Sequence, residues 1–568
     1  MVDLSTKPYH LDKDQMEWVE HTIAQMTTEE KIGQLFVNMV VNAEERQPEQ
    51  IKLMLETYHP GAIRYHNAAK EELWEMADCL QTNSNIPLLI ASNCEAGGNG
   101  GTLGGTPLAN GAALAAIDSA AAVYEMACIA AREAAAVGCN WNFAPVVDLT
   151  SNWRNTIVQL RAFNDNPDDV IRYSKAFFEG MKTQNIATCM KHFPGDGTEE
   201  NDQHLLMGIN ELSCEAWDAS FGKVYRELID AGVMTIMAGH IALPEYSRKL
   251  VPGIRDEDIR PATLAPELIT GLLKGQLGFN GMVVTDASHM IGMFGATIPR
   301  KEQVPQAIAA GCDMFLFFND REEDFSYMLE GYRNGTITEE RLSDALHRIL
   351  GVKAALNLHQ RKAASQLMLP RENLAVVGCQ EHRTAARALA DRYVTLVKDR
   401  LEYLPMTPQR YRRVRLVYIG SEDMVIAGTK IKSNNEEVIA DIRSQLKQQE
   451  FEVTVAESEK GKMEDFKKNC DCVLLILNIQ GFAQYNTMRV KWDEPAKQPW
   501  YMSELPTFVV SLSNANGMID VPMARCYINA YMPHHESFAA VLEKMMGRSA
   551  FTGKYHDNVF CGRWETRF

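Results

Sequence analysis

The sequence lacks any stretch that stays apolar over the ~20 residues that a membrane-spanning helix needs. Its first residues, MVDLSTK, also lack the basic segment and the following apolar segment of a secretory signal peptide. We therefore expect a protein of the cytoplasm, with no membrane among its partners.

The sequence also contains fewer basic than acidic residues. The 568 residues include 57 Lys and Arg against 74 Asp and Glu, a formal net charge of −17. Such a surface repels polyanions, and no Lys/Arg cluster interrupts it, so we expect no nucleic-acid partner.

Signatures of metal and nucleotide sites are missing too. The 12 cysteines are scattered without paired ligand spacing, which predicts reduced, mostly buried thiols and no metal site. Neither G-x-G-x-x-G nor a Walker loop occurs, and no G-x-S-x-G elbow supports a serine-based triad. The acidic series after residue 195 does not follow the order of a calcium loop. We expect no cofactor.

What the chain does contain is an alternation of β-rich and helical segments. The expected strands lie at 35–40, 61–65, 87–92, 141–149, 187–193, 233–240, 281–285 and 314–318. Helices are expected at 13–25, 169–182, 215–230 and 266–276, and a threonine cap with acidic residues is expected to start another near residue 28. Eight strands that alternate with helices are typical of a (β/α)8 barrel, which we expect over residues 1–355.

The pattern of the sequence changes beyond residue 355. Residues 356–392 are expected to form a linker and a connecting helix, and residues 393–568 a second domain. Its strands are expected at 394–398, 415–419, 451–455, 473–477, 508–512 and 525–530, with helices at 436–448 and 536–546. Six strands are too few for a second barrel, so we expect an open α/β sandwich.

The loop after the fifth strand of the barrel concentrates polar side chains. Residues 191–204 read KHFPGDGTEENDQH, and the proline and glycines end the strand there. In α/β enzymes the chemistry lies at the carboxyl ends of strands. Asp202 precedes His204 by two residues, and a hydrogen bond between them would fix the ring's tautomer and raise its basicity. The pattern predicts a poised proton donor.

Polar residues also follow the other strands. They are Asn93 and Glu95, Asp148, Lys191 and His192, His240, and Asp286. Asp286 ends the apolar run 283–285, and a carboxylate opposite a proton donor is what retaining glycoside cleavage requires, without a metal. A helix cap remains an alternative for Asp148 and Asp286, and a satisfied buried polar group for His240.

Three segments carry a family resemblance. Residues 26–36, 187–204 and 277–286 resemble glycoside hydrolase family 3, in particular its β-N-acetylglucosaminidase branch, which carries K-H-F-P-G-H-G followed by D-x-H. The resemblance implies a retaining exo-glycosidase for terminal β-N-acetylglucosamine that works through a covalent glycosyl-enzyme intermediate. It implies Asp286 as the nucleophile, His204 as the general acid/base and Asp202 as the residue that orients His204.

The same resemblance implies a set of sugar-binding residues. Lys191, His192 and Arg161, the last within residues 160–163, would hold the sugar in the −1 subsite. Asn93 and Glu95 stand in the family's D-x-E-G-G motif, which here reads NCEAGG. An amide in place of the carboxylate weakens a charge-assisted hydrogen bond but adds a donor, so the hexose stays open.

One further departure is Asp196, which stands where that branch mostly has a histidine. Three alternatives to a hexosaminidase therefore remain. A phosphorylase is one, because a histidine donor does not repel an anionic phosphate as a carboxylate donor would. The others are a β-glucosidase and a non-catalytic sugar-binding homologue. The oligomeric state cannot be predicted from the sequence.

Overall fold

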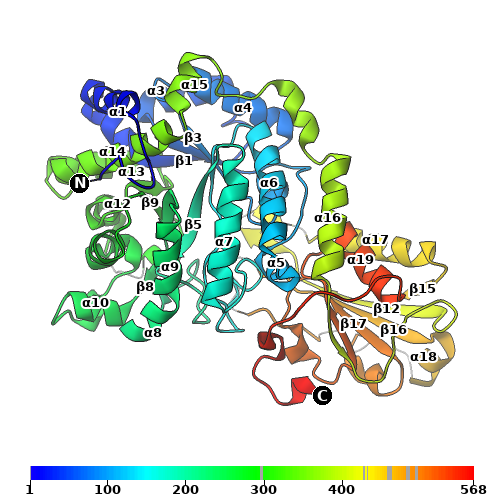
Figure 1. Cartoon of the computed structure of the whole chain (residues 1–568). Coiled ribbons are helices and arrows are strands. Elements are labelled where there is room, and N and C mark those ends of the chain that lie inside the picture. The colour runs from blue at the N-terminus through cyan, green and yellow to red at the C-terminus, as the bar shows by residue number, and fades with distance from the viewer. Residues whose placement is uncertain are drawn as a thin grey trace. The chain divides into compact units, whose positions relative to one another are not determined.

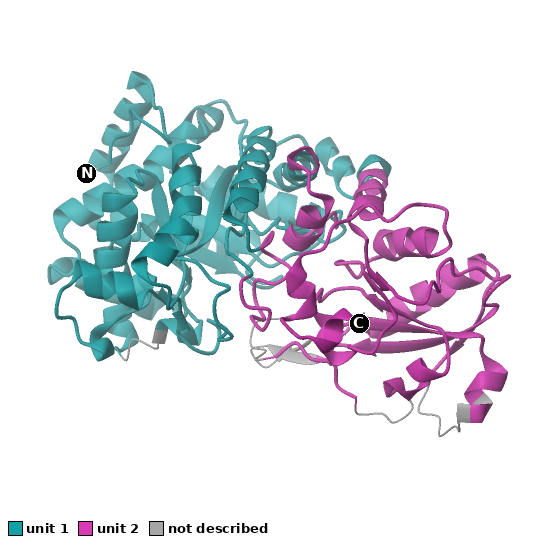
Figure 2. Ribbon diagram, turned by 60° about the horizontal axis from the view of Figure 1, so that its bottom comes forward, with its two compact units in different colours: residues 1–106, 123–150, 165–382 teal, residues 107–122, 151–164, 383–568 magenta. Residues whose placement is uncertain are grey.

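The structure, a computed structural model, describes residues 2–294, 298–426, 429–431, 433–456, 463–481, 487–492 and 497–568. It divides into two compact units (Figure 2). The first comprises residues 1–106, 123–150 and 165–382, and the second residues 107–122, 151–164 and 383–568. Two segments from the first half of the chain thus belong to the second unit. The domain limits expected at 355 and 392 remain predictions.

The first unit is built on a closed barrel (Figure 1). Within the described residues its strands are β1 (Phe36–Val40), β2 (Ala62–Tyr65), β3 (Leu89–Ser92), β4 (Trp141–Asn142), β5 (Ala187–Phe193), β7 (Thr235–Ala238), β9 (Met282–Ala287) and β10 (Met314–Leu316). Neighbouring strands run parallel, and β1 closes the ring against β10, with Phe36 opposite Phe315. The predicted (β/α)8 barrel is confirmed.

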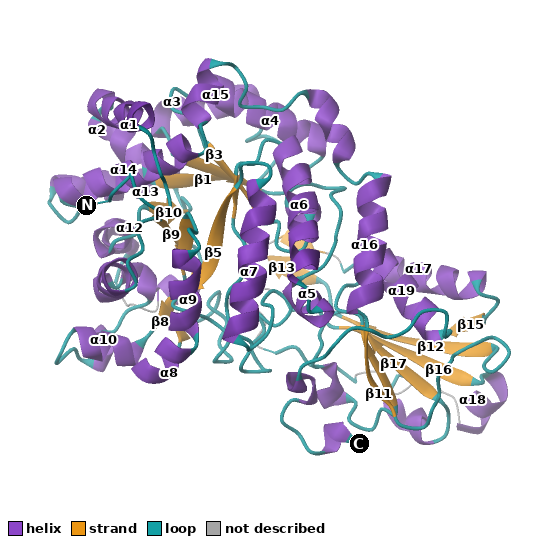
Figure 3. Ribbon diagram, viewed as in Figure 1, coloured by secondary structure: helices purple, strands orange, loops and turns teal. Residues whose placement is uncertain are grey.

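Helices surround this barrel, as the secondary-structure colouring of Figure 3 shows. They are α1 (Lys13–Gln25), α2 (Thr28–Gln34), α3 (Pro48–Tyr58), α4 (Lys70–Asn83), α6 (Ala120–Ala136), α7 (Pro167–Lys182), α8 (Cys214–Ala219), α9 (Phe221–Asp230), α10 (Pro244–Leu250), α11 (Ile291–Phe294), α12 (Arg300–Ala310), α13 (Arg321–Arg333), α14 (Glu339–Ala355) and α15 (Leu358–Ala363). The predicted cap of α2 is present: Thr27 accepts from the amide of Glu30, whose carboxylate accepts from the amide of Thr27. No helix of the described ranges is long and apolar enough to cross a membrane.

Three predicted elements of the barrel differ from the observed ones. The helix expected at 266–276 is a π-helix at Glu267–Gln276. The strand expected at 141–149 ends as β4 at Asn142, because Pro145 has no amide hydrogen for a regular ladder. The helix expected at 215–230 breaks into α8 and α9 at Ser220, whose hydroxyl donates to the carbonyl of Ala216 at 2.6 Å and competes with the helical pattern.

The second unit contains an open six-stranded sheet in the order β11-β18-β17-β16-β12-β15. The strands are β11 (Thr395–Asp399), β12 (Arg413–Gly420), β15 (Glu452–Val455), β16 (Cys472–Asn478), β17 (Thr507–Ser511) and β18 (Cys526–Asn529). All neighbours are parallel except β11 and β18. The central strand β16 is buried along its length, as expected where helices cover both faces. The predicted α/β sandwich is confirmed.

The remaining elements are short or lie in the second unit. They are α5 (Gly111–Ile117), α16 (Gln380–Tyr393), α17 (Asn435–Gln448), α18 (Met463–Asn469), α19 (His535–Met545) and the strand pairs β6 (Gly208–Ile209) with β8 (Ile241–Ala242), and β13 (Met424–Ile426) with β14 (Thr429–Ile431).

Candidate active site

Strand β5 delivers two consecutive polar residues to the mouth of the barrel. Successive side chains of a regular strand face opposite sides, so Lys191 and His192 should diverge. The register of β5 against β7 shifts here, with Lys191 opposite Met237 and Phe193 opposite Ala238. An irregularity of this kind re-aims a side chain. It allows both polar groups to serve one site.

Asp148 holds the ring of His192 in place. Its fully buried carboxylate accepts from Nδ1 of His192 at 2.7 Å, and from the backbone amides of His192 and Asp196 at 3.1 and 2.8 Å. The sequence left Asp148 open between a cap and a sugar ligand, and the structure shows it orienting the imidazole. Burial, and then the charge of Asp148, raise the pKa of Asp196.

The other ring nitrogen of His192 faces Asp286, near the end of β9. Nε2 of His192 lies 4.0 Å from Oδ2 of Asp286, and the amide of Ala287 donates to Oδ1 at 2.7 Å. Burial alone would raise the pKa of Asp286, but the imidazoles of His192, His240 and His204, together with the Ala287 amide, hold the pKa below its ordinary value. The lowered pKa favours the ionised form of Asp286.

Lys191 and Glu95 form a buried ion pair. The Nζ atom of Lys191 lies 2.6 Å from Oε1 of Glu95, and their side chains are 3% and 17% exposed. The structure thus brings the loop after β3 against β5, as a shared sugar site requires. Asn93, on the same loop, is exposed, and no described residue forms a hydrogen bond with its side-chain amide. That amide is free to meet a ligand.

The predicted hydrogen bond between Asp202 and His204 is present. Nδ1 of His204 donates to the carboxylate of Asp202 at 2.7 Å, and the backbone amide of His204 donates to the same oxygen at 2.9 Å. The Asp202 side chain is fully buried and that of His204 is 27% exposed. The carbonyls of Gln203 and His204 accept from Gly292 and Ile291, just beyond β9. The dyad is thereby fixed beside the strand of Asp286.

His240 is a buried and satisfied side chain. Its Nε2 donates to the carbonyl of Ala287 at 3.0 Å, and its Nδ1 lies 3.0 Å from the hydroxyl of Thr263. Burial lowers the pKa of His240. The structural interpretation considered for it is confirmed, although its bond to Ala287 places it next to Asp286.

Arg161 lies on residues 151–164, which belong to the second unit. Its assignment to the −1 subsite remains a prediction. One residue of the site loop gave no signal in the sequence: Gln203 is only 2% exposed, although a polar residue between two charged groups on a loop is ordinarily solvated.

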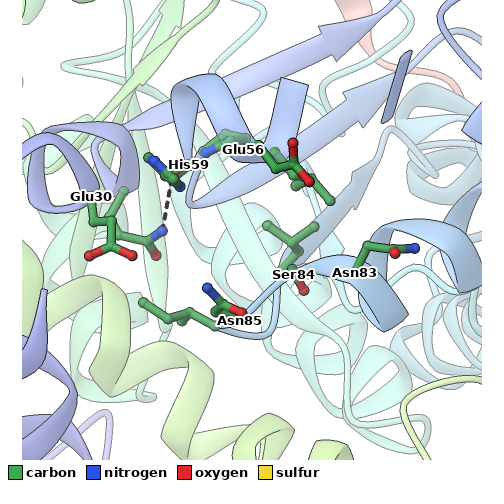
Figure 4. Close-up of a pocket in the computed structure, with 11 residues that line it drawn as sticks. Glu30, Glu56, His59, Asn83, Ser84 and Asn85 are labelled. Carbon is green, nitrogen blue, oxygen red and sulfur yellow. Dashed lines mark hydrogen bonds between the residues drawn. The ribbon is translucent and has the colours of Figure 1, made fainter. Parts of the chain in front are cut away.

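A separate cavity of about 300 Å³ lies at the amino ends of β1, β2 and β3 (Figure 4). Gln34, Pro60 and Leu88, which line it, precede these strands. The polar cluster lies at the opposite ends of the strands, so this cavity is no part of it. Residues at the amino end of such a barrel serve stability more often than chemistry.

The barrel and the cluster of carboxylates and imidazoles at the carboxyl ends of its strands define the class of protein, a (β/α)8-barrel enzyme. In the described ranges no group of three or more His, Cys, Asp or Glu side chains is arranged to hold a metal ion.

Comparison with known proteins specifies the family. Residues 27–352 match the glycosyl hydrolase family 3 N terminal domain. The whole chain is 38% identical, over 575 aligned residues and 100% of both chains, to a beta-N-acetylglucosaminidase/beta-glucosidase of Cellulomonas fimi. The chain belongs to glycoside hydrolase family 3, as its motifs predicted, and is a carbohydrate-active enzyme.

Solved structures agree with this assignment. The beta-glucoside phosphorylase BglX is 34% identical, superposes with a TM-score of 0.92, and is matched over 99% of both chains. A family 3 beta-N-acetylglucosaminidase from Paenibacillus sp. str. FPU-7 has a TM-score of 0.76 at 23% identity, over 93% of this chain and 98% of that one. The second similarity shows the shared fold.

Proposed function

We propose that the chain is a retaining, exo-acting enzyme that cleaves terminal β-N-acetylglucosamine through a covalent intermediate on Asp286. The observation that carries the proposal is the environment of Asp286, a largely buried carboxylate whose pKa is nonetheless held down by surrounding imidazoles. A carboxylate that stays ionised when withdrawn from water is suited to attack an anomeric carbon.

His204 is the proposed acid and base. In the first step Nε2 of His204 gives its proton to the glycosidic oxygen. At the same time the carboxylate of Asp286 attacks the anomeric carbon, and the bond between that carbon and the glycosidic oxygen breaks. In the second step His204 takes a proton from water, whose oxygen attacks that carbon and releases Asp286. Asp202 holds Nδ1 of the ring and stabilises the imidazolium.

The proposed −1 subsite includes Lys191, His192, Asn93 and Glu95 of the first unit. The lysine and imidazole donate to sugar hydroxyls, and Glu95 accepts from them. The Cellulomonas fimi relative is named for both N-acetylglucosamine and glucose. We therefore propose β-N-acetylglucosaminides as the first substrates and β-glucosides as the second.

A second candidate is phosphorolysis. A neutral imidazole, unlike a carboxylate donor, lets an anionic acceptor approach the intermediate, and the BglX relative is named a phosphorylase. In this reaction a phosphate oxygen attacks the anomeric carbon in place of water. The bond to Asp286 breaks and a sugar 1-phosphate leaves.

Matched aryl β-glycosides of N-acetylglucosamine, glucose and xylose test both candidates, each with and without millimolar phosphate. Free N-acetylglucosamine, released at a rate that phosphate does not change, supports the first candidate. A sugar 1-phosphate supports the second. Absence of turnover on all three glycosides contradicts both.

We further propose a cytoplasmic location, since all 12 cysteines are free thiols, as is usual in a reducing compartment. Residues 1–355 are proposed as the catalytic domain, 356–392 as the linker and 393–568 as the C-terminal domain.

A further inference from the structure

Gln203 lies between the two members of the dyad and is anchored at both ends of its amide. Its Nε2 donates to Oδ2 of Asp196 at 2.7 Å, and its Oε1 accepts from the backbone amide of His240 at 2.8 Å. Gln203 and Asp196 are 2% and 3% exposed. A buried side chain whose amide nitrogen and oxygen are both hydrogen-bonded at these distances has little freedom to move.

The Asp196 end of this link leads to the nucleophile. The amide of Asp196 donates to Asp148 at 2.8 Å, and Asp148 holds Nδ1 of His192 at 2.7 Å. His192 in turn presents Nε2 to Asp286 at 4.0 Å. Four contacts thus connect Gln203 to the carboxylate.

The Oε1 end of the Gln203 amide also connects to the region of Asp286. Gln203 accepts from the amide of His240, whose ring donates to the carbonyl of Ala287 at 3.0 Å. Ala287 follows Asp286 directly in β9. The side chain of Gln203 is therefore fixed on two sides to groups that contact or adjoin the nucleophile.

The loop that carries the dyad has no regular structure from residue 198 to residue 207. Its backbone also packs tightly against Gly292, where an added Cβ would lie 2.6 Å from the carbonyl oxygen of Gln203. Only glycine therefore fits at position 292, in α11 just beyond β9. The Gln203 amide adds two hydrogen bonds to the backbone bonds that hold the loop there.

We propose that Gln203 and Asp196 are positioning residues that set the place of His204 relative to Asp286. This inference deepens the proposed function and rests on it. It also accounts for Asp196, which departs from the branch's usual histidine: its carboxylate is the acceptor that the Gln203 amide requires.

The consequence for catalysis is specific. A misplacement of about 1 Å costs on the order of a hundredfold in rate. A displaced His204 donates its proton less well in the first step, which kcat/KM reports. This value therefore falls for substrates with poor leaving groups and is retained for activated aryl glycosides, which need no acid. General loosening of the fold would lower both rates together.

Three variants test the pair. Gln203→Glu places two carboxylates opposite each other, and Asp196→Asn places a second amide opposite Gln203. Either should lower kcat/KM for an alkyl glycoside about tenfold or more relative to a dinitrophenyl glycoside. The double variant reverses donor and acceptor. The amide introduced at position 196 donates to the carboxylate introduced at position 203, and the backbone amide of His240 still finds an acceptor, so the link is restored.

We therefore expect D196N/Q203E to recover the kcat/KM ratio of the original enzyme to within about threefold. Gln81→Glu is the matched control. Gln81 is also a buried glutamine that uses both amide atoms, bonding the carbonyl and amide of Leu88 just before β3. It should lower the thermal midpoint without changing the kcat/KM ratio.

The outcomes distinguish the positioning role of Gln203 and Asp196 from the acid/base role of His204. Uniform loss on both substrates in the single variants, an unchanged ratio, or failure of the double variant to recover would overturn the positioning role. His204→Ala serves as the reference: if it leaves the kcat/KM ratio unchanged, the proposed acid/base fails and the inference with it. If only His204→Ala changes the ratio, the function stands and the inference falls.

Discussion

The Nε2 atom of His192 lies 4.0 Å from Oδ2 of Asp286, and Nδ1 of the same ring is held by Asp148 at 2.7 Å. The imidazole is thus fixed by one carboxylate while it faces another. Because Asp286 is largely buried, its ionisation depends on such neighbours.

The first prediction concerns the acid limb of kcat/KM, which reports the ionisation of Asp286 in the free enzyme. A depressed pKa keeps the carboxylate charged at lower pH, so we expect the limb below about pH 4. His192→Gln removes the imidazole that faces the carboxylate but leaves the burial, and should move the limb to higher pH. Short assays after pH jumps measure it. His21→Gln, on the exposed side of α1, should not move the limb, and an unmoved limb in His192→Gln contradicts the assignment.

The second prediction concerns the nucleophile. Asp286→Ala should lower turnover at least about a thousandfold, because no covalent intermediate can form. Azide should restore part of the turnover by entering the space of the carboxylate, and should give a glycosyl azide of inverted configuration. The surface variant Asp256→Ala is the control. Retention of more than a few per cent of activity, or an azide product of retained configuration, would remove Asp286 from the mechanism.

The third prediction concerns the dyad. Asp202→Asn keeps the shape of the side chain but removes the negative charge that stabilises the imidazolium of His204. We expect kcat/KM for alkyl glycosides to fall about a hundredfold or more, with a much smaller loss on dinitrophenyl glycosides. Measuring both series distinguishes this result from misfolding. Equal losses on both would mean that Asp202 supports the loop and not the proton transfer.

Local patterns predicted much of this site. The strand at 187–193 was expected and observed with the same limits, because a buried apolar run meets Pro194 and Gly195 there. The hydrogen bond between Asp202 and His204 follows from their spacing of two residues. Such features depend on neighbours in the chain, so the sequence carries them directly.

Features that depend on distant partners could not be predicted. Gln203 bonds a residue 7 positions before it and another 37 positions after it, and nothing in the spacing indicates that these meet. The role of Asp148 likewise needs His192, 44 residues away. The shortened β4 shows the same limit, because an apolar run continues after Asn142 while Pro145 interrupts its ladder.

The fourth prediction concerns Glu133, a fully buried carboxylate of α6. It accepts from the amide and hydroxyl of Thr106, from Nδ1 of His382 and from the amide of Gly378, at 2.6 to 3.1 Å. Glu133→Gln leaves these donors without a charged acceptor and should lower the free energy of unfolding by about 3–5 kcal/mol. Glu125→Gln, on the exposed face of the same helix, is the control. Similar denaturation midpoints for the two variants would contradict the prediction.

The last prediction concerns Asn93, whose exposed side-chain amide has no hydrogen-bond partner among the described residues. Asn93→Asp restores the carboxylate of the family motif, and a charge-assisted hydrogen bond is about twice as strong as a neutral one. We expect KM to fall about tenfold for β-glucosides and β-N-acetylglucosaminides alike, because the family's carboxylate grips hydroxyls distal to the acetamido group. A 4,6-dideoxy substrate should lose that gain. If the variant instead changes the preference between the two sugars, residue 93 lies near C2 of the sugar and not near its distal hydroxyls.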